Sequence, residues 1–218
     1  KSGIFGHYLL SMPFLNYGGP IGFPEARRRL SADAVDLAAG TGADLLELRG
    51  RGVAPDPPLT EVRRKVTVVM ELPNDPAVLW SERIRAKVRS QIRRPQKEGM
   101  VARFGPDEVG PFYDVFARNM RDLGTPVLPR RFFSAIAERF PENVEFGCVY
   151  LKDLPVAAGC GFVWREEFEM TWASSLKEHA RMAPNMMLYW SFMERMVQRG
   201  LRSFNFGRCT PDSGTHRF

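Results

Sequence analysis

The chain has 218 residues, of which 44% are hydrophobic and 11% aromatic, values that are typical of a soluble globular protein. No apolar run approaches the roughly 18 residues that cross a bilayer, so the sequence predicts no membrane-spanning helix. The net charge of +6 and the pI near 9.5 favour an anionic partner, such as a nucleic acid, a nucleotide-linked substrate or a membrane surface, although a modest excess of positive charge can also serve solubility alone.

The first third of the chain predicts three short strands and one helix. The expected strands are 7–12, 44–49 and 65–72. A turn cluster dense in glycine and proline, 13–20, follows the first strand. The helix is expected to run from about Pro24 to Ala39 and to end at Gly40. Its inward face is expected to comprise Ala26, Leu30, Ala34 and Leu37.

A second, longer helix is expected from about Pro76 to Arg94, where Pro95 ends it. Between Arg83 and Lys97 there are seven basic residues and no acidic one. Like charges four residues apart repel by a few tenths of a kcal/mol, and a bound anion would offset this cost. The segment is therefore either an anion-binding surface or a solvated face that lies near acidic loops. Its buried stripe repeats every four residues, at Trp80, Ile84, Val88 and Ile92.

The remaining two thirds alternate strands and helices. The expected strands are 100–104, 143–151, 155–164, 167–174 and 202–206, and the expected helices are 107–123, 129–140 and 185–199. On helix 107–123, Asp114 is expected to pair with Arg118 on the outer side. In strand 167–174, apolar and polar residues alternate, which predicts two different sheet faces. The apolar face comprises Phe168, Met170 and Trp172, and the polar face comprises Glu167, Glu169 and Thr171.

The order of elements in 155–208 is the most informative feature of the chain. The segment predicts a strand, a tight turn, a strand, a loop, a helix and a strand, an order that resembles the core of the GNAT acyltransferases. The loop before the helix, 175–184, contains no glycine, although a phosphate-cradling loop is expected there in members that use coenzyme A. The segment therefore favours an acyl donor other than coenzyme A.

Other chemistries find no support in the sequence. There is no Gly-x-Ser-x-Gly elbow, P-loop or dinucleotide fingerprint, and the three histidines have no recognisable partners. The three cysteines lack metal-ligand spacing. Cys148 and Cys160 lie in apolar strands, where a buried, reduced thiol is expected, and this fits a reducing cytoplasm.

Acyl transfer to an amine needs a base for the amine and a hydrogen-bond donor for the carbonyl oxygen. Glu169 is the best candidate base if its strand face lines a cleft; the alternative is a surface glutamate on an open sheet. The N-terminus of helix 185–199 suits an anionic ligand. Lys177, His179 and Arg181 would add positive charge in the preceding loop.

Four segments together resemble the FemAB-related proteins, in the branch associated with exosortase and PEP-CTERM exopolysaccharide systems. They are Leu10-Ser-Met-Pro-Phe14, Asn16-Tyr-Gly-Gly-Pro20, Val88-Arg-Ser-Gln-Ile-Arg-Arg-Pro-Gln-Lys97 and Ser203-Phe-Asn-Phe-Gly207. The resemblance extends over most of the chain, and its Arg-Ser-Gln-Ile-Arg-Arg part is fairly specific. Where this family commonly has Phe-Asp-Phe-Gly, the chain has Asn205, which can form hydrogen bonds but cannot act as a base.

The resemblance implies an α/β (α+β) fold with two tandem GNAT-like modules, each a mixed, largely antiparallel sheet flanked by helices. The first module, 1–75, is expected to be incomplete, and the second, 76–218, to lack the C-terminal segment of the family. Family members with known activity transfer amino acids from aminoacyl-tRNA to the peptide of a cell-wall precursor. In this branch the acceptor is open, and a surface polysaccharide or a lipid-linked sugar is plausible.

These observations predict a cytoplasmic acyl or aminoacyl transferase that serves exopolysaccharide or cell-envelope biosynthesis. The donor is expected to be aminoacyl-tRNA or another acyl carrier, with no resident cofactor or metal, and association with a membrane surface is compatible. The alternatives are a coenzyme A-dependent N-acetyltransferase and a non-catalytic GNAT-like binding module. The candidate catalytic residues are Glu169, Asn205 and Tyr17, and the candidate substrate-binding residues are Arg89, Arg93, Arg94, Lys97, Lys177, Arg181, Asn185 and Arg208. Replacing Arg93 and Arg94 by alanine is expected to weaken binding of the anionic substrate without unfolding the protein.

Overall fold

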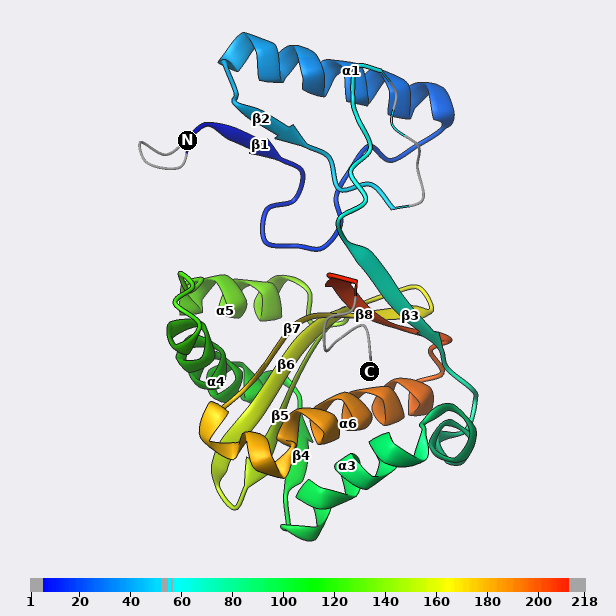
Figure 1. The fold of residues 1–218 in the computed structure, drawn as a ribbon, viewed down its shortest axis with the longest axis vertical. Coiled ribbons are helices and arrows are strands. Elements are labelled where there is room, and N and C mark those ends of the chain that lie inside the picture. The colour runs from blue at the N-terminus through cyan, green and yellow to red at the C-terminus, as the bar shows by residue number, and fades with distance from the viewer. Residues whose placement is uncertain (1–5, 52–54, 56, 212–218) are drawn as a thin grey trace. The chain divides into compact units, whose positions relative to one another are not determined.

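The computed structural model describes residues 6–51, 55 and 57–211 (Figure 1). The chain divides into two compact units, 1–65 and 66–218. Compact units are not equivalent to the modules of a family, so the module boundary expected near residue 75 stays a prediction. Within the described residues, no helix is both long enough and apolar enough to cross a bilayer.

The first unit is a small parallel strand–helix–strand arrangement. Strand β1 (Tyr8–Leu10) pairs with β2 (Leu45–Glu47), and α1 (Pro24–Thr41) connects them. The helix ends at Gly42, not at the expected Gly40, because Gly42 adopts the left-handed conformation at φ 64° and donates its N–H to the last turn. Its inward face was predicted correctly only at Ala34, which is half-buried; Ala26, Leu30 and Leu37 are exposed, and the buried residue of the helix is Ser31.

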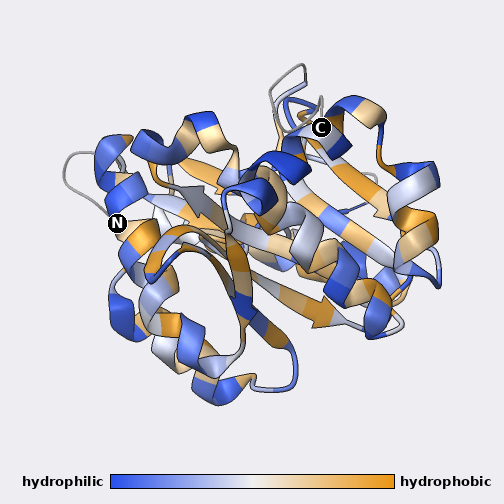
Figure 2. Ribbon diagram, turned by 90° about the horizontal axis from the view of Figure 1, so that it is seen from below, coloured by the Kyte–Doolittle hydropathy of each residue, from blue (hydrophilic) through white to orange (hydrophobic). Residues whose placement is uncertain are grey.

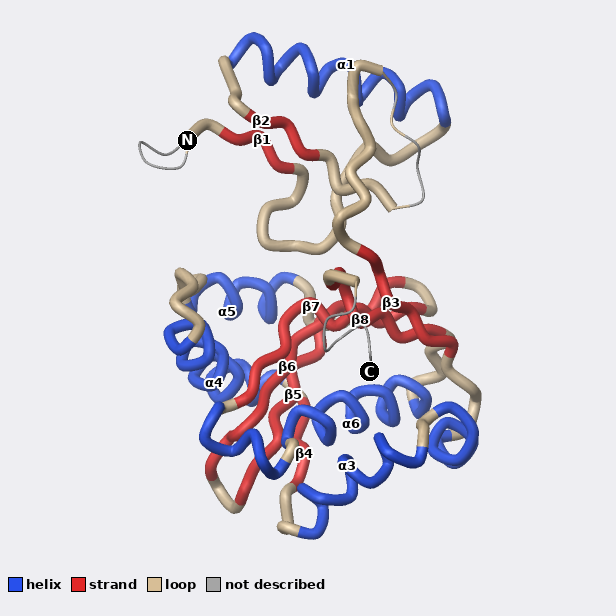
Figure 3. Tube along the Cα trace, viewed as in Figure 1, coloured by secondary structure: helices blue, strands red, loops and turns tan. Residues whose placement is uncertain are grey.

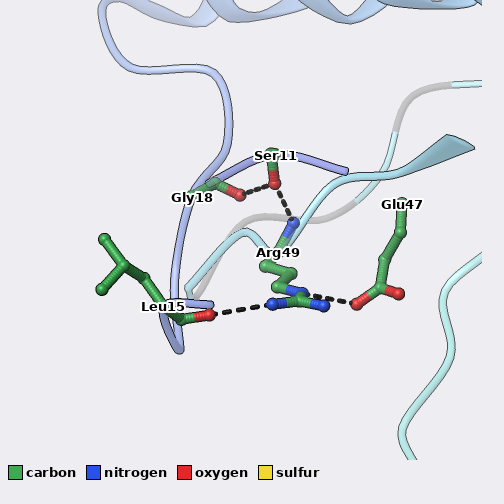
Figure 4. Close-up of polar contacts among 5 residues, drawn as sticks. All are labelled: Ser11, Leu15, Gly18, Glu47 and Arg49. Carbon is green, nitrogen blue, oxygen red and sulfur yellow. Dashed lines mark hydrogen bonds and ion pairs between the residues drawn. The ribbon is translucent and has the colours of Figure 1, made fainter. Parts of the chain in front are cut away.

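The loop between β1 and α1 is held by Arg49, which follows β2 (Figure 4). The Arg49 guanidinium donates to the Leu15 carbonyl at 2.9 Å and to the Glu47 carboxylate at 2.7 Å. The Arg49 backbone N–H donates to the Ser11 hydroxyl at 2.9 Å, and that hydroxyl donates to the Gly18 carbonyl. The Gly18 N–H donates in turn to the Arg49 carbonyl at 3.1 Å, so three positions of the loop, Ser11, Leu15 and Gly18, are bonded to one residue.

The second unit is built on a six-stranded sheet in the order β3-β8-β7-β6-β5-β4 (Figure 3). All neighbouring strands are antiparallel except β7 and β8, which are parallel. The strands are β3 (Val66–Glu71), β4 (Val101–Phe104), β5 (Val144–Leu151), β6 (Leu154–Trp164), β7 (Glu167–Ser175) and β8 (Ser203–Cys209). This confirms the expected mixed, largely antiparallel sheet.

Helices cover both faces of this sheet. On one face, α3 (Ala86–Lys97) and α6 (Pro184–Gln198) pack over a core rich in methionine and aromatic residues. On the other face, α4 (Val109–Asp122) and α5 (Arg130–Arg139) pack over an aromatic cluster that includes Phe112, Phe133 and Phe146. Figure 2 shows hydrophobic stretches on the strands, interrupted by hydrophilic residues, and helices that carry both kinds of residue. Cys148 and Cys160 are fully buried, as expected.

The predicted helix from Pro76 to Arg94 is broken in the structure. A short α2 (Pro76–Val78) continues into a π-helical turn (Leu79–Arg83), and Ile84 and Arg85 are extended before α3 begins. The extended Ile84 still places its side chain in the core, at 3% exposure, so the buried stripe is confirmed although the helix is interrupted. Pro95 does not end α3, because a proline in the last turn removes one hydrogen bond without preventing the turn.

Strand β7 contains a bulge that the alternation did not reveal. Cys160 of β6 pairs with Trp172, but the next residue, Gly161, pairs with Met170, so Thr171 is the extra residue. Trp172 therefore lies on the α4/α5 face, with its ring 5.2 Å from that of Phe133, and not beside Phe168 and Met170 as predicted.

The Gly161 backbone lies so close to β7 that a Cβ atom there would be 2.2 Å from the Glu169 carbonyl oxygen.

A second correction concerns α4. Asp114 pairs with Arg130 of α5, and Arg118 pairs with Glu178 at 2.6 Å, because each of these partners reaches α4 from another element. The expected pair between Asp114 and Arg118 is thus replaced by contacts that tie α4 to its neighbours.

Candidate functional site

Strands β7 and β8 diverge after a short paired segment. They pair at Glu167↔Ser203, Phe168↔Phe204 and Glu169↔Asn205. Beyond this point β8 continues along β3, up to the pair Cys209↔Val66, whereas β7 continues along β6. Two parallel strands that separate in this way leave backbone hydrogen-bonding groups along their inner edges, which a ligand can use.

A cleft of about 670 Å³ opens where these strands diverge. This volume is in the usual range for a small-molecule site, roughly 300–1,000 Å³. The lining comes from both sides of the sheet: the first turns of α3 and α6 on one side, and α4 on the other. The lining residues are Arg85, Lys87, Val88, Gln91, Asn119, Ala173, Ser174, Ser175, Asn185, Met186, Leu188, Tyr189 and Phe206.

One part of this cleft is positively charged. Arg85 and Lys87 are its charged lining residues, and neither forms an ion pair with another described residue. The N-termini of α3 and α6 both border the cleft, and no side chain caps either helix. The starts of two helices, with the positive ends of their dipoles, and two cations therefore border the same space, an arrangement that favours an anion.

Other residues that line the cleft are apolar. Met186 and Tyr189 of α6 and Phe206 of β8 lie along it, with the Tyr189 and Phe206 rings 5.6 Å apart. Burial raises the pKa of the Tyr189 phenol, so this side chain is neutral at physiological pH. The cleft thus combines an anion-binding part with an apolar wall.

Two polar side chains meet at the sheet. Ser174, on β7, is 5% exposed, and its hydroxyl oxygen accepts a hydrogen bond from the Asn119 side-chain amide at 3.1 Å. Asn119 reaches this position from α4, so the contact joins the helix layer to the strand that borders the cleft. Neither residue was predicted from the sequence. The two residues come together only when α4 packs on the sheet, and no local sequence pattern indicates such a contact.

Of the candidate catalytic residues, two lie where the strands part. Glu169 and Asn205 are the last register partners of β7 and β8, and both lie on the face opposite the buried Phe168 and Phe204. Asn205 is fully buried; its amide nitrogen donates to Glu167 at 3.0 Å and its oxygen accepts the Gly207 N–H at 2.9 Å. Tyr17 belongs to the first unit, where the guanidinium of Arg51 lies 5.4 Å from its ring centre.

Three of the candidate arginines contact the protein itself and do not line the cleft. Arg89 donates to the carbonyls of Trp80, Ser81 and Ile84, at 3.2, 3.1 and 2.5 Å. The Arg93 guanidinium lies 5.4 Å from the centre of the Trp80 ring. Arg94 donates to the Arg181 carbonyl at 2.8 Å.

The remaining candidates are distributed over the second unit. Asn185, in the first turn of α6, lines the cleft, and its role in ligand binding stays a prediction. Lys97 is exposed in the last turn of α3, and Arg208 is partly buried on β8. Lys177 and Arg181 are exposed on a 3₁₀ turn, Lys177–Met182, that fills the glycine-free loop.

This 3₁₀ turn uses part of the backbone of the loop for its own hydrogen bonds. The His179 N–H donates to the Leu176 carbonyl at 3.1 Å, and the Ala183 N–H donates to the Ala180 carbonyl at 3.0 Å. These two N–H groups are therefore engaged within the turn, which leaves fewer donors for a phosphate than an open, glycine-rich loop would offer.

Comparisons with known proteins agree with this architecture. Residues 82–218 match the model of the acetyltransferase (GNAT) domain. The fold is similar to that of FemX, with a TM-score of 0.60 and 11% identity over 69% of this chain and 54% of that one. It is also similar to the C-terminal domain of a candidate lysylphosphatidylglycerol synthetase from Agrobacterium fabrum, with a TM-score of 0.59 and 13% identity over 93% of this chain and 64% of that one.

A third similar structure is L-PGS from Bacillus licheniformis, with a TM-score of 0.57 and 12% identity over 95% of this chain and 65% of that one. At such identities the likeness concerns the fold alone. The chain spans between about half and two thirds of the length of these three structures. Among curated proteins, none matches the sequence at a significant level.

Proposed function

Because the chain belongs to the GNAT acetyltransferase family, we propose that it transfers an acyl group from an anionic, phosphate-bearing donor to an amine. The observation that carries this proposal is the cleft between β7 and β8, where two uncapped helix N-termini, Arg85 and Lys87 border the same space. Phosphate oxygens on the donor would bind in this positive part, and the acyl group would lie against Met186, Tyr189 and Phe206.

The proposed base is Glu169. It lies at the last paired position before β7 and β8 diverge and is not among the residues that line the cleft, so a proton from an amine bound there would reach it through water. Its neighbour Glu167 accepts a hydrogen bond from the buried Asn205, so the amide that replaces the family's acid holds a second carboxylate in place. Asn205 would act on the position of Glu167 and not on the proton of the amine.

We further propose aminoacyl-tRNA as the donor in preference to coenzyme A. The glycine-free loop spends two of its N–H groups on a 3₁₀ turn, which opposes a pyrophosphate cradle at this place. The resemblance of the sequence to the FemAB-related proteins, whose members with known activity use aminoacyl-tRNA, supports the same choice. From the resemblance to FemAB-related proteins, the acceptor would be an amino-bearing sugar or peptide of a cytoplasmic exopolysaccharide or cell-envelope precursor.

A coenzyme A-dependent N-acetyltransferase is the second candidate function. The family model that the chain matches is described as an acetyltransferase domain, and the cleft offers positive charge for the phosphates of coenzyme A. In that case Lys177 and Arg181, on the 3₁₀ turn, would replace the missing loop donors.

Calorimetric titration of the full chain decides between these candidates. Acetyl-CoA and a non-hydrolysable aminoacyl-tRNA analogue are titrated separately at low and moderate salt. Salt-sensitive binding of the tRNA analogue alone supports the aminoacyl reading, because released counterions make phosphate contacts weaken as salt rises. Micromolar binding of acetyl-CoA supports the second candidate. If neither ligand binds, both proposed donors are wrong, and the protein either uses another acyl carrier or is a non-catalytic binding module.

A further inference from the structure

The hydrogen bond between Asn119 and Ser174 has a fixed direction. A side-chain amide nitrogen can only donate, so the Ser174 oxygen accepts and its own hydrogen points elsewhere. Among the described residues, no acceptor takes that hydrogen, and Ser174 is 5% exposed. A buried hydroxyl hydrogen without an acceptor is costly, which makes a ligand atom in the adjoining cleft its natural partner.

We infer that Ser174 donates a hydrogen bond to the carbonyl oxygen of the acyl group as that oxygen becomes negative, and that Asn119 is the positioning residue that fixes the direction of the donor. The inference rests on the proposed acyl transfer in the same cleft. Both residues line this cleft, and Ser174 lies on β7 beyond the point where β8 departs, so the group that they act on can approach from the open edge of the strand.

The proposed step is an addition followed by an elimination. The nitrogen lone pair of the amine forms a bond to the acyl carbon, and the π electrons of the carbonyl move onto its oxygen, which Ser174 stabilises. The surplus proton of the nitrogen passes to a carboxylate or water. The oxygen then re-forms its double bond, the bond between the acyl carbon and the donor's oxygen or sulfur breaks, and the leaving group takes up a proton.

Hydroxylamine allows a test before the natural acceptor is known, because this small amine yields a hydroxamate that can be quantified from any acyl donor. Enzyme-dependent hydroxamate formation is measured with acetyl-CoA and, separately, with alanyl-tRNA. Ser174→Ala is expected to lower kcat by about 100- to 1,000-fold, the usual effect of removing one donor to an oxyanion, with KM for the donor unchanged.

Asn119→Asp tests whether the direction of the hydrogen bond between residue 119 and Ser174 matters. Aspartate has nearly the same shape, but its carboxylate accepts the Ser174 hydrogen and turns the donor away from the cleft. The variant is therefore expected to lose about as much kcat as Ser174→Ala, and the double variant to lose no more than either single one. Asn119→Ala leaves the hydroxyl free to rotate and is expected to lose less, about 10-fold. A purely structural contact would not produce this order.

The possible results separate the inference from the function on which it rests. If the wild type forms hydroxamate and Ser174→Ala keeps its kcat, or loses kcat and donor affinity together, the inference is wrong and acyl transfer stands. If the wild type accelerates hydroxamate formation from neither donor, the proposed function fails and the inference fails with it. Thermal unfolding of each variant serves as the folding control. Should Ser174→Ala not fold, Ser174→Cys keeps the size with a weaker donor and is expected to lose about 10-fold in kcat.

Discussion

Individual basic residues on the segment 83–97 have different surroundings in the structure, and this leads to two competing predictions. Arg93 and Arg94 contact Trp80 and the Arg181 carbonyl, whereas Arg85 and Lys87 line the cleft. If the cleft binds the phosphates of the donor, Arg85→Ala/Lys87→Ala weakens binding by about 10- to 100-fold, since each charged contact contributes about 1 kcal/mol or more.

Calorimetry measures the affinity of Arg85→Ala/Lys87→Ala and of Arg93→Ala/Arg94→Ala for whichever donor probe binds the wild type. The pair whose loss weakens binding more is the pair that contacts the phosphates. The salt dependence should also become shallower in the variant that loses phosphate contacts. A larger loss in Arg93→Ala/Arg94→Ala would instead locate the anion on the outer face of α3, as the sequence predicts, and would remove the main support for the cleft.

Glu194 offers a prediction about pH. This half-buried residue on α6 has a pKa above the ordinary value of 4.5, because burial disfavours the charged carboxylate. A raised carboxyl pKa means that the folded state binds the proton more tightly, so this residue lowers stability as pH rises above its ordinary pKa. Glu194→Gln is thus expected to raise Tm near about pH 7, and this gain should vanish below about pH 4.

Thermal scans of both proteins at the two pH values measure this gain. The exposed Glu138→Gln, on α5, removes the same charge and is the control for changes in net charge. An equal gain in both variants, or a gain that persists in acid, would show that burial of Glu194 is not its cause.

At the scale of elements, the interruption before α3 is stabilised by Arg89. Its guanidinium donates to three carbonyls, of Trp80, Ser81 and Ile84, which the broken helix leaves without helical partners. Hydrogen bonds from a charged donor contribute about 1.5–3 kcal/mol, so Arg89→Ala is expected to lower the free energy of unfolding by about 2 kcal/mol. Urea denaturation measures this difference.

Arg93→Ala is the matched control, since Arg93 is exposed and contributes a cation–π contact of about 0.5–1 kcal/mol. If both variants lose the same stability, Arg89 does not stabilise the break. The result also bears on the site, because the break places Arg85 and Lys87 at the start of a helix that borders the cleft.

Periodicity in the sequence predicts most of these elements but not their irregularities. The stripe at Ile84 and Ile92 is buried as expected, yet the same repeat conceals an extended residue between two helices. The alternation in β7 predicts the inward Phe168 and Met170 but misplaces Trp172, because one bulge reverses every later side chain. Such irregularities depend on close approach by other elements, as at Gly161, and leave no regular pattern.

The candidate site was less predictable than the fold for the same reason. Asn185 could be found because a helix start after a loop is visible in the sequence. Asn119 and Ser174 are 55 residues apart and meet only once α4 lies on the sheet. The sequence shows that the arginines are charged but does not show which groups they contact. Arg89 was predicted to bind a ligand, whereas in the structure its guanidinium donates hydrogen bonds to backbone carbonyls of its own chain.

For the whole molecule, the two units differ sharply in how much apolar surface they bury. Every buried apolar side chain among the described residues belongs to the unit 66–218, whereas Ser31 is the one buried residue described in 1–65. A two-stranded sheet with one helix is marginally stable by itself, but a six-stranded sheet covered on both faces has two hydrophobic clusters. We therefore expect a chain comprising 65–218 to fold by itself.

All four tryptophans lie within 66–218, so their fluorescence reports on the same unit in the full chain and in the shorter one. The shorter chain should unfold in urea as a single cooperative transition, with a midpoint close to that of the fluorescence transition of the full chain, because the residues that it lacks contribute little to either core cluster. A broad or absent transition would show that 1–65 is required for the stability of the sheet. In that event the cleft between β7 and β8 could not be studied in isolation, and the two units would have to be treated as one folding unit.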